Sequence, residues 1–195
     1  MTNPYTVPNL LTALRIVLIP VIVGLFYLPY GWGDIVAGVL FAVAGITDTF
    51  DGYLARRMGQ VSHLGTFLDP VADKLIVATA LVLIVSRNPV WYVTLTAAVI
   101  IGREIAISAL REWMAEIGAR RKVAVSALGK FKTIAQIVGL SMMLFSENLL
   151  GLPIYWIGLA LTVVAAVLTL WSMSIYLKAA WPELKSKAHP DRGHP

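Results

Sequence analysis

Long apolar stretches alternate with short polar ones along most of the chain. Each apolar stretch approaches or exceeds the roughly 20 residues that an α-helix needs to cross the hydrocarbon core of a bilayer. The pattern therefore predicts an all-α fold, a polytopic membrane protein with six transmembrane helices. The six segments lie at about 10–29, 34–56, 67–86, 89–112, 131–148 and 153–177.

Turn-forming residues and charges mark the connections between these segments. Gly31 follows the first segment, Pro89 follows the third, and Gly151 follows the fifth. The longest polar connection, 114–130, carries the basic run 120–122, which we expect to anchor on anionic lipid. We expect one membrane domain over residues 1–184 and a disordered tail over 185–195.

Composition supports this class and excludes others. Of the 195 residues 58% are hydrophobic and only 14% are charged, against roughly 25% charged in an ordinary globular domain. No cysteine is present, so disulfides and thiolate metal sites are excluded. The net charge of +5 does not predict a nucleic-acid partner, because the basic residues follow the membrane segments and form no single patch.

Basic residues divide unequally between the two ends of the predicted bundle. The connections after the first, third and fifth segments contain only Arg87. The other side contains Arg56, Arg57, Arg120, Arg121, Lys122, Lys130, Lys132, Lys178, Lys185, Lys187 and Arg192. Since cytoplasmic loops carry the excess of Lys and Arg, both termini are predicted to be cytoplasmic.

Four aspartates are the clearest candidates for chemistry. Asp48 and Asp51 lie three positions apart at the end of the second segment, and Asp69 and Asp73 lie four apart at the start of the third. Each pair therefore shares one helix face, and a tight turn between the segments would let the two pairs face each other. Ionised carboxylates beside hydrocarbon are costly and repel one another unless cations neutralise them. Hard oxygen ligands in this number predict a site for two divalent ions, Mg²⁺ (or Mn²⁺).

Residues near the aspartates suggest a phosphorylated ligand. Gly52 and Ala55 are small enough to let a ligand approach the backbone, although small residues also serve helix packing. Arg56 is expected to grip a diphosphate in preference to anchoring at the interface. Arg15 lies inside an apolar segment, which predicts a buried pairing or a ligand role.

The whole string resembles the signature of a known enzyme family. It reads Asp48-x-x-Asp51-Gly52-x-x-Ala55-Arg56, eight residues, then Gly65-x-x-x-Asp69-x-x-x-Asp73, and it is similar at every fixed position to that of the CDP-alcohol phosphatidyltransferases. The resemblance implies six transmembrane helices and a homodimer. It implies that two divalent cations are bound by the aspartates, with Asp73 also the general base. It further implies transfer of a phosphatidyl group from a CDP-linked lipid, CDP-diacylglycerol, to an alcohol with release of CMP.

Three further stretches extend this resemblance. Asn9, Thr12 and Arg15 match an Asn-x-x-Thr-x-x-Arg pattern at the family's entry helix, where Asn9 is expected to cap the helix. Stretches 102–112 and 126–133, the second including Thr133, resemble the branch that uses glycerol 3-phosphate.

The second and third of these stretches also carry charges that suit such an acceptor. Arg103, Arg111 and Lys130 are expected to bind its dianionic phosphate. Lys132 is expected to face solvent or lipid. The implied location is a bacterial cytoplasmic (inner) membrane, with membrane lipids as neighbours.

Other readings of the aspartates remain open at this stage. Another CDP-alcohol phosphotransferase, of the phosphatidylserine or cardiolipin type, would share the signature. An intramembrane prenyltransferase also uses aspartate pairs and Mg²⁺, but leaves Gly52, Ala55 and Arg56 unexplained. A cation transporter would be expected to place its carboxylates near the midplane of the membrane and not at one face.

Overall fold

A computed structural model describes the backbone of residues 7–58, 63–118, 127–149 and 151–187. Side chains are described for residues 10–47, 68–118, 131–149, 151–178 and 180–181. Six helices follow one another along the chain, and no strand occurs among the described residues, so the all-α prediction is confirmed. They are α1 (Val7–Phe26), α2 (Gly31–Met58), α3 (His63–Arg87), α4 (Trp91–Glu116), α5 (Ala127–Phe145) and α6 (Ile154–Lys187).

The helices differ from the predicted segments mainly at their polar ends. α4 continues to Glu116 and α6 to Lys187, beyond the apolar residues, because a helix satisfies its own backbone groups whether or not its side chains are apolar. The predicted cap at Asn9 is wrong, since α1 begins at Val7 and Asn9 lies within its first turn. Pro8 suits that turn, where a backbone N–H has no intrahelical partner.

The outer surface of the bundle is strongly apolar. Large side chains such as Trp91 and Val167 are 76% and 61% exposed. Two stretches, Trp91–Glu116 and Ile154–Lys178, are long and apolar enough to cross a membrane, and three further apolar stretches, Leu10–Phe26, Gly31–Thr47 and Phe131–Phe145, are shorter. A surface of this kind needs lipid to cover it. The protein is therefore best described as a membrane protein.

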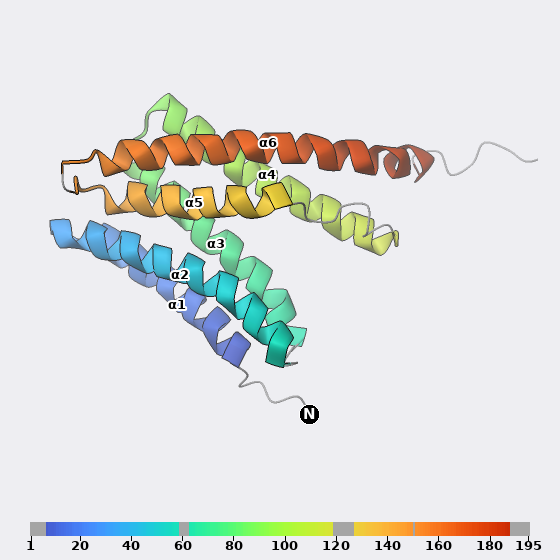
Figure 1. Cartoon of the computed structure of the whole chain (residues 1–195), viewed down its shortest axis with the longest axis horizontal. Helices are drawn as coiled ribbons and strands as arrows, with labels where there is room; N and C mark the ends of the chain where they lie inside the picture. Colours follow the sequence, from blue (N-terminus) through green and yellow to red (C-terminus); the bar gives the residue numbers. More distant parts are fainter. Residues whose placement is uncertain (1–6, 59–62, 119–126, 150, 188–195) are drawn as a thin grey trace, which may run out of the picture.

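The helices spread apart from one end of the bundle (Figure 1). The connections α1–α2, α3–α4 and α5–α6 lie at one end, which we call the loop end. α1 packs against α2 and α3, α5 packs against α6 and α2, and α4 packs against α6 and α3. Toward the opposite end, where α1 begins and α6 finishes, the α1–α3 group and the α4–α6 group diverge. We call this the open end.

Glycines allow α5 to approach both of its neighbours closely. A methyl group at Gly38 of α2 would lie 2.8 Å from the backbone nitrogen of Phe145 on α5. Between α5 and α6, a methyl group at Gly158 would lie 2.7 Å from the carbonyl oxygen of Gly139. Small residues at such contacts are typical of membrane helix packing. They place α5 firmly between α2 and α6.

Arg87 joins three helices at the loop end. Its guanidinium donates to both carboxylate oxygens of Asp34, at 2.6 and 2.7 Å, in the bidentate geometry typical of strong Arg–carboxylate pairs. It also donates to the carbonyl oxygen of Phe26 at 3.3 Å and lies 3.9 Å from the centre of the Phe26 ring. The single basic residue predicted for this side thus links the ends of α1, α2 and α3.

Candidate active site

A cavity of about 270 Å³ lies between the two helix groups, and all six helices contribute to its wall. Its polar lining residues lie between the helix midpoints and the open end. α2 contributes Phe41, Ala44 and Gly45 to the wall, beside apolar residues of α3 and α5. The polar and charged lining residues are Arg15, Asp73, Lys74, Arg103, Glu104, Arg111, Lys132, Thr133, Gln136, Ser172 and Tyr176.

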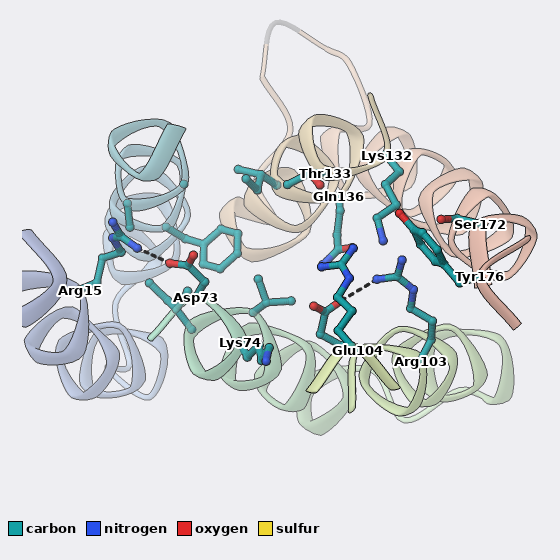
Figure 2. A pocket seen from close by; sticks show the side chains of 17 residues that line it. Arg15, Asp73, Lys74, Arg103, Glu104, Lys132, Thr133, Gln136, Ser172 and Tyr176 are labelled. Carbon is teal, nitrogen blue, oxygen red and sulfur yellow. Dashed lines mark hydrogen bonds and ion pairs between the residues drawn. The ribbon is translucent and has the colours of Figure 1, made fainter. Parts of the chain in front are cut away.

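At one side of the cavity, α1 supplies hydrogen-bond donors to the carboxylates of α3. Thr12 donates its hydroxyl to Asp69. Arg15 forms an ion pair with Asp73 (Figure 2). Both donors are buried, at 1% and 3% exposed. The predicted buried pairing of Arg15 is therefore confirmed. Because Asp69 and Asp73 are one helical turn apart, the two contacts orient both carboxylates together.

The second aspartate pair lies on α2, near the end that leads to α3. Asp48 and Asp51 belong to the helical backbone of α2, but their side chains lie outside the described residues. The side chains of Ala55 and Arg56 and the surroundings of Gly52 also lie outside the described residues. The facing arrangement of the four carboxylates therefore stays a prediction.

The other side of the cavity is cationic. Arg103 of α4 and Lys132 of α5 are buried, at 6% and 8% exposed, and Arg111 of α4 also lines the wall. The guanidinium carbon of Arg111 lies 5.4 Å from the ring centre of Tyr176 on α6, within the range of a cation–π contact. Arg103, Lys132 and Tyr176 gather on the side away from Arg15 and Asp73 (Figure 2).

Positive charge exceeds negative charge on this side. Glu104 is the lining carboxylate here, and its oxygen accepts a hydrogen bond from Arg103 at 2.9 Å. The buried Nε of Arg103 has no hydrogen-bond partner among the described residues. Buried cations are costly unless an anion compensates them. This side of the cavity therefore suits an anionic group such as phosphate.

The structure brings together the two predicted acceptor-binding residues whose side chains it describes, since Arg103 and Arg111 line one cavity. Thr133, from the stretch that resembles the glycerol 3-phosphate branch, lines the same cavity. The side chain of Lys130 lies outside the described residues, as does that of Asn9. The prediction for Lys132 is wrong, because this residue faces the cavity and neither solvent nor lipid.

The position of Lys132 follows from the rotation of α5. Phe131 is 66% exposed on the outer surface, so its neighbour, about 100° further round the helix, turns inward. A sequence signal was present, since Lys132, Thr133 and Gln136 form a polar stripe at helical spacing within an apolar segment. Sequence reasoning also missed Lys74, Glu104, Gln136, Ser172 and Tyr176, which line the same cavity.

Comparison with known proteins agrees with this geometry. The sequence profile of the family described as CDP-alcohol phosphatidyltransferase matches residues 5–171. A relative from Salmonella choleraesuis (strain SC-B67) is 53% identical over 180 residues, which cover 92% of this chain and 97% of the relative. A relative from Escherichia coli (strain K12) has the same identity and coverage. Both relatives are named CDP-diacylglycerol–glycerol-3-phosphate 3-phosphatidyltransferase.

Proposed function

Because this chain belongs to the CDP-alcohol phosphatidyltransferase family, we propose that it transfers the phosphatidyl group of CDP-diacylglycerol to glycerol 3-phosphate. The products are phosphatidylglycerol phosphate and CMP, and the reaction belongs to phospholipid biosynthesis. The observation that carries this assignment is the two-sided cavity, with the α3 carboxylate Asp73 on one side and a cation cluster on the other. A transferase that joins a diphosphate lipid to a phosphorylated alcohol needs both sides.

The cation cluster supports the choice of acceptor. Glycerol 3-phosphate brings a dianionic phosphate, which Arg103, Arg111 and Lys132 are placed to bind through charge-assisted hydrogen bonds. Lys130 stays a candidate for the same role. An alcohol without a phosphate, such as serine or inositol, would leave Glu104 as the lining carboxylate for three cations, two of which, Arg103 and Lys132, are buried. The same cluster disfavours a cation pathway, because positive walls repel a cation.

The carboxylates suit a divalent metal. Asp48, Asp51, Asp69 and Asp73 offer oxygen ligands only, which Mg²⁺ (or Mn²⁺) prefers, and the Asp69 and Asp73 side chains are oriented one turn apart on α3. We propose that these four residues hold two ions. When bound, such ions neutralise the diphosphate and favour attack at its phosphorus.

The protein's own residues account for the remaining steps. Gly52 and Ala55 let CDP-diacylglycerol approach α2, and Arg56 grips its diphosphate. Asp73, oriented by Arg15, accepts the proton of the 1-hydroxyl of glycerol 3-phosphate. That oxygen attacks the lipid-side phosphorus, and the bond from this phosphorus to the CMP oxygen breaks. The cation cluster holds the acceptor's phosphate throughout, which fixes the distance between hydroxyl and phosphorus.

We also propose a cellular location for the protein. The six helices serve as six spans of a bacterial cytoplasmic membrane, with both termini and the cavity at the cytoplasmic side. Support comes from the cavity, which lies toward the end where α1 begins and α6 finishes, and from the basic residues of that side. The expected assembly is a homodimer in contact with membrane lipids.

An acceptor panel tests the proposal directly. Purified protein is mixed with CDP-diacylglycerol and Mg²⁺, and CMP release is measured with glycerol 3-phosphate, serine, inositol or phosphatidylglycerol as the acceptor. We expect release with glycerol 3-phosphate to exceed that with every other acceptor. Faster release with serine or phosphatidylglycerol would assign the chain to another branch of the family.

A further inference from the structure

Arg103 and Glu104 form an ion pair between neighbouring positions of one helix. Adjacent side chains on a helix point about 100° apart and do not normally meet. Their contact at 2.9 Å therefore shows that both side chains turn into the same cavity, where Glu104 compensates the nearest buried cation (Figure 2). Figure 2 also places Lys132 close to this pair, approaching from α5.

The two partners of this pair have different surroundings. The Arg103 side chain is 6% exposed, whereas the Glu104 side chain is 42% exposed. A buried guanidinium needs an anion wherever it points, but a part-exposed carboxylate regains water readily when its partner is lost. Loss of the contact is therefore costly for the buried Arg103 but costs Glu104 little. An anion with more contacts to offer can replace the carboxylate.

The cluster can make those additional contacts. Arg103 uses one Nη in the contact with Glu104, and its buried Nε has no hydrogen-bond partner among the described residues. Lys132 and Arg111 line the same wall. A phosphate has three or more oxygens for these donors, whereas Glu104 reaches Arg103 with one oxygen.

We propose that Glu104 is the internal counter-ion of the acceptor site. Its carboxylate compensates Arg103 while the cavity holds no acceptor, and the acceptor's phosphate replaces it on Arg103 when the acceptor binds. This inference rests on the proposed function, since it identifies the acceptor's phosphate as the replacing anion. Glu104 thus lowers the affinity of the site for anions, because an anion that binds this Nη of Arg103 must displace the carboxylate.

The matched test replaces the carboxylate by its neutral isostere, Glu104→Gln. The Michaelis constant for glycerol 3-phosphate and the inhibition constant for inorganic phosphate should both fall about two- to fivefold, the range that a part-exposed ion pair contributes. The Michaelis constant for CDP-diacylglycerol should not change. Glu112→Gln, the same charge change at an exposed site of α4 outside the cavity wall, should leave all three constants unchanged.

Thermal unfolding in detergent gives a second readout that does not depend on activity. Without an anion, Glu104→Gln should melt below the wild type, because Arg103 has lost its charged partner. Inorganic phosphate should raise the melting temperature of the variant more than that of the wild type, since tighter binding gives larger stabilisation. If the glutamine variant does not fold, the same changes in melting temperature are expected of Glu104→Ala.

The outcomes separate this inference from the proposed function. Unchanged or raised constants for glycerol 3-phosphate and inorganic phosphate would overturn the counter-ion role and indicate that Glu104 orients Arg103 or binds the acceptor itself. Absence of glycerol-3-phosphate-dependent CMP release in the wild type would overturn the proposed function. The phosphate-induced shift in melting temperature would still test the counter-ion in that case.

Discussion

Arg15 of α1 and Asp73 of α3 form an ion pair across 58 positions of sequence. A second contact runs parallel to it, from Thr12 to Asp69, so two residues three apart on α1 match two carboxylates four apart on α3. Residues at these spacings share one helix face. α1 is therefore the element that orients the carboxylates of α3.

Arg15→Gln should lower kcat by up to about 100-fold, the cost of a misplacement of about 1 Å in a reacting group. The reason is that Asp73 loses the partner that orients it. The acceptor's Michaelis constant should change little, because Arg15 lies on the side of the cavity away from the cation cluster. Steady-state kinetics with each substrate varied in turn would check this. Arg15→Lys should retain part of the rate, and a rise in the acceptor's Michaelis constant as large as the fall in kcat would contradict the assignment.

Asp73→Asn should separate binding from chemistry. The amide keeps the shape of the side chain but cannot accept the proton of the attacking hydroxyl. Affinity for CDP-diacylglycerol should therefore be retained better than the single-turnover rate, and both quantities should be measured on the same preparation. If affinity and rate fell in equal measure, Asp73 would act as a metal ligand alone.

Removal of divalent cations should abolish activity, and Asp48→Ala, Asp51→Ala or Asp69→Ala should each remove nearly all of it. Loss of one carboxylate leaves too few oxygen ligands for two ions. CMP release in excess EDTA, followed by restoration with Mg²⁺ or Mn²⁺, is the measurement. Full turnover in EDTA would rule out the metal proposal.

Neutralising the cation cluster should damage the acceptor step selectively. Arg103→Gln, Arg111→Gln and Lys132→Gln each remove a charge-assisted contact to a buried phosphate, worth roughly 1.5–3 kcal/mol. The value of kcat/KM for glycerol 3-phosphate should therefore fall about 10- to 150-fold, while the Michaelis constant for CDP-diacylglycerol stays within a small factor. Lys178→Gln, at an exposed position of α6, is the matched control. Wild-type acceptor kinetics in all three cavity variants would exclude this phosphate site.

The pair between Arg87 and Asp34 should contribute to stability and not to chemistry. Both side chains are partly buried, at 30% and 20% exposed, and the contact is bidentate. Arg87→Ala should lower the free energy of unfolding by roughly 1–3 kcal/mol, the range for a hydrogen-bonded charged pair. A double-mutant cycle with Asp34→Ala measures the coupling. Specific activity of the folded fraction should be unchanged, because the pair lies at the loop end.

The order and type of the elements could be predicted from the sequence. An apolar stretch of this length in a bilayer satisfies its backbone hydrogen bonds by forming an α-helix. Helix ends could not be predicted, since Glu116 and Lys187 are polar residues inside helices that continue beyond the apolar stretch. The apolar pattern reports contact with lipid. The end of a helix depends on local hydrogen bonds that hydropathy does not record.

Within the site, the sequence predicted the chemistry of the residues better than it predicted where their side chains lie. The aspartate spacing placed Asp69 and Asp73 on one face, and the apolar setting of Arg15 predicted its buried pair. Lys132 was missed because a lysine at the end of an apolar segment usually extends toward the interface. Its inward direction depends on how α5 packs between α2 and α6, and this contact joins parts of the chain that are distant in sequence.

The distribution of these contacts has a consequence for how the chain is made. The pairs Arg15–Asp73 and Arg87–Asp34 both form within α1–α3, the part of the chain that a ribosome delivers first. The wall of the cavity, in contrast, contains residues of all six helices, including Tyr176 of α6. The first three helices can therefore form both ion pairs early in synthesis, but the cavity wall is complete only after α6 has been made. A fragment that ends after α3 should retain both ion pairs but lack the α4, α5 and α6 walls of the cavity.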